Sequence, residues 1–185
     1  MRLIQHQMSQ LLIVDIQNKV LELIHNQDSI TSKAGVLIQS ATVLRIPVIA
    51  TALDAKQRGE IAAPLGALLG PTAATFDKLH FSALRNERVR DLLDEHRDHG
   101  RGQVVVAGLE THIAVLQTSL DLISEGFEVY VVADAVGSRI PASQDIALRR
   151  LERSGAHLVD AEMVVSEWLE KVGTPDYNSL SALIK

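Results

Sequence analysis

The stretch at residues 104–121 most constrains what this chain can fold into. It opens with an apolar run rich in β-branched residues, at 104–107, which is typical of a strand buried on both faces. Gly108 interrupts the run, and from about Thr111 the apolar residues recur at helical spacing. That spacing predicts one apolar helix face, made of Ile113, Leu116, Leu120 and Ile123. A strand that turns at once into a helix leaves backbone N–H groups free to stabilise an anion or an oxyanion, although every strand–helix joint offers such groups.

Length and composition exclude several classes of function. The chain has 185 residues, of which 46% are hydrophobic, and we expect residues 1–185 to form a single domain. A net charge of −5 argues against nucleic acid or an acidic membrane as the partner. No apolar run approaches the roughly 18 residues that a membrane span requires, and the amino terminus lacks the apolar core of a secretory signal. We therefore expect a cytoplasmic protein, and the absence of cysteine excludes a thiol nucleophile.

The rest of the chain alternates predicted strands and helices. Strands are predicted at residues 11–16, 48–53, 75–76, 104–107, 128–133 and 156–159. Helices are predicted at residues 27–44, 86–99, 143–154, 161–172 and 177–184, besides the central helix that begins near Thr111, whereas residues 55–75 form a long excursion with short helical pieces. In the helix at 143–154, the residues expected to point inward are Ile146, Ala147, Leu148 and Leu151. The alternation predicts an α/β fold with a parallel sheet covered on both faces, and ligands in such folds bind beyond the carboxyl ends of the strands.

Four motifs occur in one order along the chain. They are VDIQ at residues 14–17, FDKLHFSAL at 76–84, GLETHIAVLQTSLDL at 108–122 and YVVADAVGSR at 130–139. Their order and spacing resemble the isochorismatase-like hydrolases, also called the cysteine hydrolase family, and most of all the short isochorismatase-domain-containing proteins. The resemblance runs from about Leu11 to the carboxyl terminus. It implies a Rossmann-like three-layer α/β/α sandwich around a six-stranded parallel sheet, assembled as a homodimer or a larger homo-oligomer.

The resemblance also implies a catalytic set, of which one member is missing. The family's usual set is an aspartate, a lysine and a cysteine; Asp15 and Lys78 match the first two, whereas Ala114 stands at the position of the cysteine. A methyl group cannot attack a carbonyl, so the acyl-enzyme chemistry of the family's amidases has no nucleophile here. The resemblance places the oxyanion hole at the backbone N–H groups of Glu110 and Ala114, with a cis peptide between Leu109 and Glu110. A buried Asp15 beside Lys78 could hold or deliver one proton.

We expect a small and mostly apolar pocket, suited to a compact carbonyl compound. The residues predicted to form its walls are Ile16, Gln17, Phe76, Leu79, Leu109 and His112, although a histidine at a helix start more often packs or caps. Ser82, Thr111 and Ser119 could in principle replace the thiol, but none occupies the matched position.

Two further predictions concern a metal site and an acidic side chain. The family's nicotinamidases bind a metal through an Asp/His cluster after the second strand. Residues 51–60 read TALDAKQRGE here and contain no histidine, so we expect no metal and no other cofactor, and nicotinamide is disfavoured as the substrate. Asp134 is expected to fix the loop before Arg139 by hydrogen bonding rather than to react.

Three functions fit this set of residues. The first is a hydrolase for a small amide or ester whose thiol has been lost, so that it binds a ligand without turnover. The second is a non-catalytic binding or scaffold subunit, in which Asp15 and Lys78 do not contribute to partner binding. The third is cleavage of a vinyl ether of the isochorismate type, which needs no cysteine because Asp15 can act as the acid with Lys78 as its electrostatic partner. We rank them in the order hydrolase, scaffold and vinyl-ether cleavage.

Overall fold

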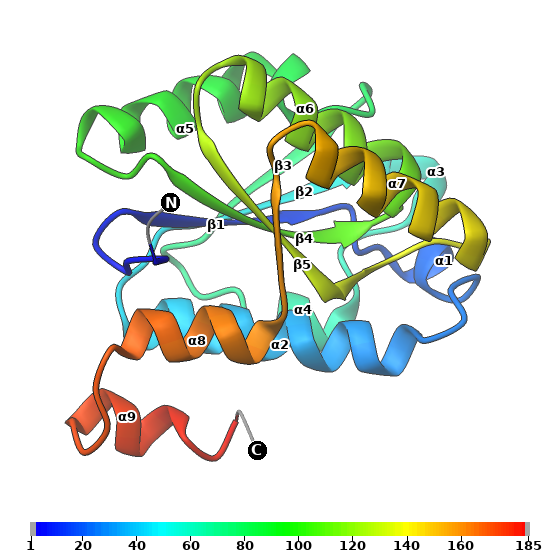
Figure 1. Cartoon of the computed structure of the whole chain (residues 1–185). Helices are drawn as coiled ribbons and strands as arrows, with labels where there is room; N and C mark the ends of the chain where they lie inside the picture. The colour runs from blue at the N-terminus through cyan, green and yellow to red at the C-terminus, as the bar shows by residue number, and fades with distance from the viewer. Residues whose placement is uncertain (1–2, 184–185) are drawn as a thin grey trace.

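A parallel sheet runs through the middle of the molecule, with helices on both of its faces (Figure 1). The structure is a computed structural model that describes residues 3–183. Its strands are β1 (Ser9–Val14), β2 (Val48–Leu53), β3 (Ala74–Lys78), β4 (Gln103–Leu109), β5 (Glu128–Gly137) and β6 (His157–Val159). Their order across the sheet is β3-β2-β1-β4-β5-β6, and all neighbouring pairs are parallel. The predicted α/β sandwich around a six-stranded parallel sheet is therefore confirmed.

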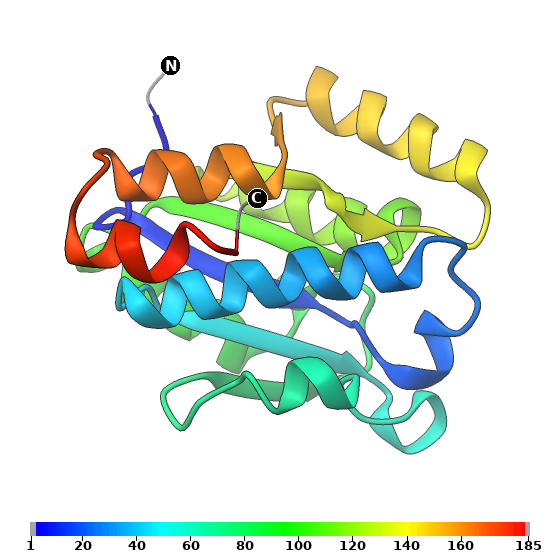
Figure 2. The same cartoon turned by 90° about the horizontal axis from the view of Figure 1, so that it is seen from below.

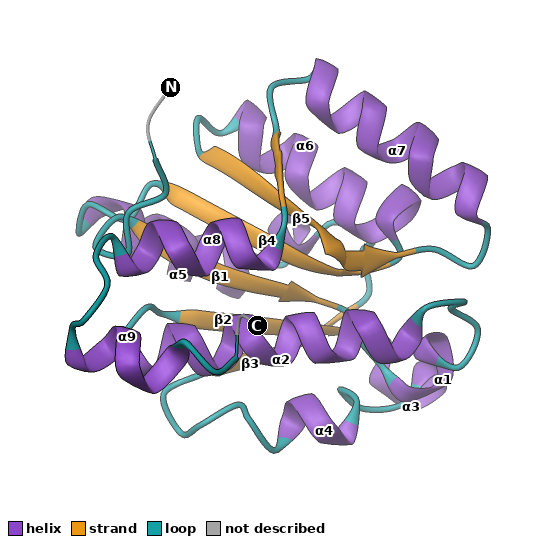
Figure 3. Ribbon diagram, turned by 60° about the horizontal axis from the view of Figure 1, so that its bottom comes forward, coloured by secondary structure: helices purple, strands orange, loops and turns teal. Residues whose placement is uncertain are grey.

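Helices form the two outer layers. They are α1 (Asn18–Leu21), α2 (Gln27–Val43), α3 (Ala55–Arg58), α4 (Ala63–Gly66), α5 (Glu87–Asp98), α6 (Leu116–Ser124), α7 (Pro141–Arg153), α8 (Ala161–Leu169) and α9 (Pro175–Leu180), with a 3₁₀ turn η1 (Ala83–Arg85) and a π-helical turn η2 (Thr111–Val115). Helices α5, α6 and α7 cover one face, and α2 and α8 lie side by side across the other (Figures 1 and 2). Figure 3 shows the short helices α1 and α3 together beyond the carboxyl ends of the strands. Within the described range, no helix has the length and apolar character that crossing a bilayer requires.

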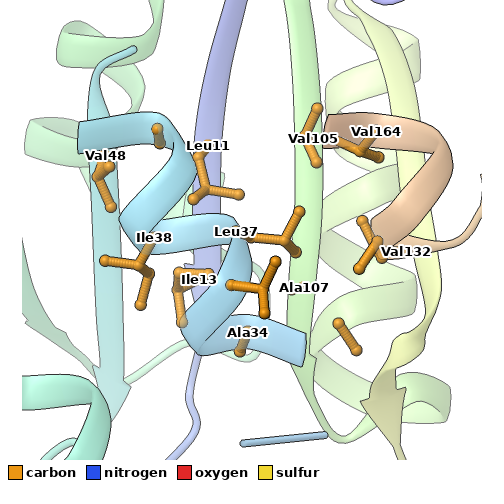
Figure 4. Close-up of a cluster of buried hydrophobic side chains, with 14 of the residues drawn as sticks. Leu11, Ile13, Ala34, Leu37, Ile38, Val48, Val105, Ala107, Val132 and Val164 are labelled. Atoms are coloured by element: carbon orange, nitrogen blue, oxygen red, sulfur yellow. The ribbon is translucent and has the colours of Figure 1, made fainter. Parts of the chain in front are cut away.

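The central strands are apolar throughout because both of their faces are covered. Leu11 and Ile13 of β1 pack toward α2, whereas Leu12 and Val14 belong to the core on the opposite face. Figure 4 shows Leu11 and Ile13 beside Leu37 of α2. Successive side chains of a strand point to opposite faces, so a strand buried on both reads as a continuous apolar run rather than an alternating one.

Most predicted elements are present, with shifted ends. Strand β2 has the predicted bounds, and α2 ends one residue earlier than predicted. Strand β5 runs on to Gly137, beyond the predicted end at 133, because β4 and β5 resume pairing after an irregularity near Gly108. Helix α7 begins at Pro141, since proline fits the first helical turn. The predicted terminal helix begins at Pro175, and its predicted end at Ile184 lies outside the described residues.

One prediction about a helix face is wrong and another is confirmed in part. Ile146 of α7 does not point inward, because 61% of its surface is exposed. In the central helix, Leu116 is buried, and the half-buried Leu120 and Ile123 pack against the same core, as the predicted face requires. Thr118, Ser119 and Leu122 are buried more deeply, so the centre of the packed face lies to one side of the predicted apolar residues.

The chain reverses its direction across the sheet between β3 and β4. After β1 it builds β2 and β3 outward on one side, and it then returns to add β4 on the other side of β1. Such a switch point leaves a crevice beyond the carboxyl ends of the two central strands. Val14 and Gly108 pair at that end, and a Cβ atom on Gly108 would lie 2.1 Å from the Val14 carbonyl oxygen. Only glycine therefore permits this approach of β4 to β1.

We predict that Gly108→Ala will destabilise the protein by more than about 3 kcal/mol, because the obstacle is backbone that cannot move aside. The matched control is Gly126→Ala, where φ is also positive but no atom lies within 4 Å of the added Cβ. That variant is expected to lose about 1 to 2 kcal/mol from backbone strain alone. Urea unfolding followed by circular dichroism measures both, and equal losses would contradict the close-approach explanation.

Candidate functional site

Asp15 lies directly beyond β1, at the switch point. Its backbone has a φ of +51°, and its N–H donates to the carbonyl of Thr51 at 3.0 Å. One carboxylate oxygen, Oδ1, accepts a hydrogen bond from Thr51 Oγ1 at 2.7 Å, and Oδ2 accepts one from Lys78 Nζ at 2.5 Å. Only 3% of the residue is exposed. Both oxygens are thus held in fixed directions at a buried position.

Lys78 ends β3, two strands away from β1, and reaches Asp15 past the end of β2. Besides Asp15, its Nζ donates to the carbonyls of His80 at 3.1 Å and Phe81 at 3.0 Å. Three acceptors match the three protons of an ammonium group. Burial raises the pKa of Asp15 and lowers the pKa of Lys78, because desolvation outweighs their attraction. The two pKa values move toward each other, which suits a pair that holds or passes on a proton.

The turn from β4 into η2 presents backbone donors. The peptide bond between Leu109 and Glu110 is cis. The N–H groups of Ile113 and Val115 donate to the Glu110 carbonyl at 3.0 and 3.3 Å, whereas the N–H of Glu110 itself has no acceptor among residues 3–183. The Glu110 side chain accepts from Nε of Arg139 at 2.8 Å and from its backbone N–H at 3.2 Å. This carboxylate is therefore turned toward the β5–α7 loop.

These groups surround one cavity of about 300 Å³ at the carboxyl ends of β1 and β4. Its lining residues are Asp15, Gln17, Val20, Leu23, Leu53, Arg58, Phe81, Leu109, Glu110, Ile113, Ala114 and Arg139. The volume is at the small end of the range for ligand pockets, which favours a compact ligand.

The structure brings together part of the predicted site. The predicted residues that border the cavity are Asp15, Gln17, Leu109, Glu110 and Ala114. Lys78 does not line the cavity but donates a hydrogen bond to Asp15, which does.

Four predicted wall residues lie elsewhere. Ile16 is buried in the core beneath α2, and Phe76 lies about two strand residues below the sheet edge, beside Arg88. Leu79 points away from Lys78, as successive residues do in extended chain, and 78% of its surface is exposed. His112 Nδ1 lies 2.9 Å from Ser138 Oγ, so its ring packs against the β5–α7 loop.

The other side chains singled out in the sequence do not border the cavity. Asp134 does not fix the loop before Arg139; its Oδ1 accepts from the N–H of Ala161 at 2.9 Å and holds the start of α8. Ser82 donates to Asp121 at 2.7 Å, away from the cavity. Thr111 and Ser119 are buried and do not border the cavity. Across residues 3–183, no three His, Cys, Asp or Glu side chains come together as metal ligands would.

Sequence reasoning missed several cavity residues. They are Val20, Leu23, Leu53, Arg58, Phe81, Ile113 and Arg139. Helix α1 has four residues, too few to show a periodicity. Arg58 belongs to the excursion after β2, which has no regular apolar spacing that could indicate a role for it. Arg139 is recognisable in the sequence only as the last residue of the fourth motif.

We predict strong coupling between Asp15 and Lys78. Either Asp15→Asn or Lys78→Met leaves a buried charge without its partner and should cost roughly 3 to 5 kcal/mol of unfolding free energy. The double variant should lose less than the sum, by at least about 1 kcal/mol, in urea unfolding. The matched control is the half-exposed pair of Arg97 and Asp94, whose coupling should be much smaller. Additive losses at Asp15 and Lys78 would contradict a coupled pair.

Comparison with known proteins shows which family the chain resembles. The family model of the isochorismatase domain matches residues 9–163. A relative from Phytophthora sojae, named secreted isochorismatase effector Isc1, is 33% identical over 100% of this chain and 87% of its own length. Isochorismatase domain-containing protein 2 of Xenopus laevis is also 33% identical, over 95% of this chain and 83% of its own length.

Solved structures share the fold over nearly the whole chain. The MAR1 ribonuclease of Caenorhabditis elegans is 30% identical, with a TM-score of 0.92 over 99% of this chain and 92% of that chain. The YcaC gene product of Escherichia coli, described as an octameric hydrolase of unknown specificity, is 24% identical, with a TM-score of 0.85 over 97% of this chain and 86% of that chain, and it supports the fold alone. From the match over residues 9–163 and these relatives, the chain belongs to the isochorismatase family.

Proposed function

We propose that the chain is a hydrolase-lineage protein that binds a small carbonyl compound of the amide or ester type and, with Ala114 in place of the family's cysteine, forms no acyl-enzyme. One observation carries this proposal: Asp15, bound to Lys78, and Ala114 border the same small cavity at the switch point of the sheet. The match of residues 9–163 to the isochorismatase domain supports a hydrolase-like site of this lineage.

Each group has a role that follows from its contacts. The ligand carbonyl oxygen accepts from the N–H groups of Glu110 and Ala114, the first of which has no other acceptor in the described chain. Asp15 and Lys78 hold one proton close to the reacting group. Leu53, Leu109 and Ile113 provide apolar wall that excludes water and strengthens these polar contacts.

We predict that Ala114→Cys will create hydrolysis of small amides or esters where the parent chain has none. The change adds one sulfur atom at a position that borders the cavity, beside a pair able to accept the thiol proton. Turnover of a panel of small aliphatic amides and nitrophenyl esters is the measurement. Ala114→Cys combined with Asp15→Asn is the matched control and should be inactive. A folded Ala114→Cys protein with no gain on any substrate would count heavily against the proposal.

One observation favours vinyl-ether cleavage as a second candidate function. Burial raises the pKa of Asp15, so its protonated form, the acid needed to protonate a vinyl carbon, persists to higher pH than in an ordinary aspartate. If this chemistry occurs, pyruvate appears on incubation with isochorismate, and its rate falls as the pH rises through the raised pKa because the acid is lost. No pyruvate release, or release unchanged in Asp15→Asn, would remove this candidate.

We also propose that the chain assembles with copies of itself. Leu79 and Phe81 are exposed apolar residues on the loop after β3, and Phe81 borders the cavity together with the exposed Leu23. Covering them removes apolar surface from water. Sedimentation should give a dimer or larger species, and Leu79→Ser should weaken it; a monomer at all concentrations would contradict assembly. Location in the cytoplasm stays a prediction, since the Phytophthora relative is named as secreted.

A further inference from the structure

The charged groups around the cavity do not balance. Asp15 is paired with Lys78, and Glu110 is paired with Arg139. Arg58 also borders the cavity, but its guanidinium has no hydrogen-bond acceptor or ion-pair partner within residues 3–183. The site therefore carries one excess positive charge in a chain whose net charge is −5.

The backbone around Arg58 is held on both sides. Lys19 Nζ donates to the Gln57 carbonyl at 2.8 Å, and Gln17 Nε2 donates to the Gly59 carbonyl at 2.6 Å. Gln17 also receives a hydrogen bond from the N–H of Leu53 at 2.9 Å, so this buried side chain fastens the loop to the end of β2. The loop backbone beside Arg58 is therefore held in place, while the exposed guanidinium keeps its donors free of partners within residues 3–183.

A second guanidinium completes the arrangement. Arg139 follows β5, whereas Arg58 follows β2, so the two arrive from strands that flank the central β1 and β4. Arg139 uses only Nε for Glu110, and its terminal nitrogens have no acceptor within the described chain. Two arginines with free donors at one small cavity suit a planar anion that accepts several hydrogen bonds.

We propose that Arg58, assisted by Arg139, binds a carboxylate on the ligand, so that the natural ligand is a compact carbonyl compound with one carboxylate group. A single excess positive charge matches a monoanion better than a phosphate dianion, and the cavity of about 300 Å³ favours a short ligand whose carbonyl reaches the Glu110 N–H while its carboxylate meets Arg58. The inference deepens the proposed function: it rests on the cavity as the ligand site and does not require turnover.

The test compares probes that differ by one charge. Calorimetry on the full chain measures the binding of succinamate and of malonamate against their neutral diamides, succinamide and malonamide. At least one of the two carboxylate probes, succinamate or malonamate, should bind at least about tenfold more tightly than its own diamide, as expected for charge-assisted hydrogen bonds. Equal binding of acid and diamide, failure of both carboxylates to bind, or tighter binding of inorganic phosphate would each overturn the assignment.

Variants then assign the effect to Arg58. Arg58→Gln should lower the affinity for the carboxylate to about that of the diamide, and Arg58→Lys should restore part of the loss. The matched control is Lys56→Gln, which removes the same charge from an exposed residue of the same short helix that does not border the cavity. Equal losses of carboxylate affinity in Arg58→Gln and Lys56→Gln would overturn a direct contact with Arg58. The cause would then be the general electrostatic field of the protein.

This outcome is separable from that of the proposed function. Carboxylate binding that depends on Arg58, without hydrolysis in Ala114→Cys, would support the anion site and contradict the proposed hydrolase-type pocket. Hydrolysis in Ala114→Cys that is equal for neutral and anionic amides would support the hydrolase pocket and overturn the anion site.

Discussion

The buried contact between Asp15 and Lys78 is the constraint on which the rest of the site depends. It joins the ends of β1 and β3 across β2, so three strands must end in register for the contact to form. Two ions taken out of water lose several kcal/mol of hydration each, and only close, well-directed partners offset that loss. Thr51 supplies one such partner to the carboxylate, and the carbonyls of His80 and Phe81 supply two to the ammonium. The loop after β3 is shaped by these bonds, which also bring Phe81 to the cavity.

The other half of the site depends on the close approach of β4 to β1. Gly108 lies against the Val14 carbonyl, and directly after it the chain turns into η2 with the Glu110 N–H free of acceptors in the described chain. Because the crossovers diverge at this place, a crevice remains between the two strand ends, and Val20 of α1 and Ile113 of η2 line it. A carboxylate from one strand and backbone donors from its neighbour therefore face the same small volume. The topology of the sheet, rather than any single side chain, determines that they meet.

The sequence predicts the layers better than the walls of the site. Strands β1, β2 and β4 are recognisable because burial on both faces makes each one apolar throughout, and the motifs identify Asp15 and Lys78 from the family pattern. The directions of side chains just beyond a strand depend on local backbone angles that spacing does not encode. The φ of +51° at Asp15 sends Ile16 into the core, and no periodicity indicates that angle. Arg58 is not predicted from the sequence for a different reason. An exposed arginine in an irregular segment is typical of ordinary surface, and only the fold shows that it borders the cavity.

The pair also bears on the choice between a ligand site and a scaffold. A buried ion pair is not needed to stabilise a sheet, because apolar residues of similar size often stabilise as well or better. In a chain used only for assembly, the ends of β1 and β3 could be joined by apolar packing, like the strand interiors beside them. Here Asp15, held by Lys78, instead borders a cavity that is also lined by backbone donors and by Arg58, whose guanidinium has no partner within residues 3–183, although the methyl of Ala114 provides no nucleophile. Because apolar packing at the same place would avoid the desolvation cost of two charges, the retained ion pair beside the cavity favours the proposed ligand-binding function over the scaffold.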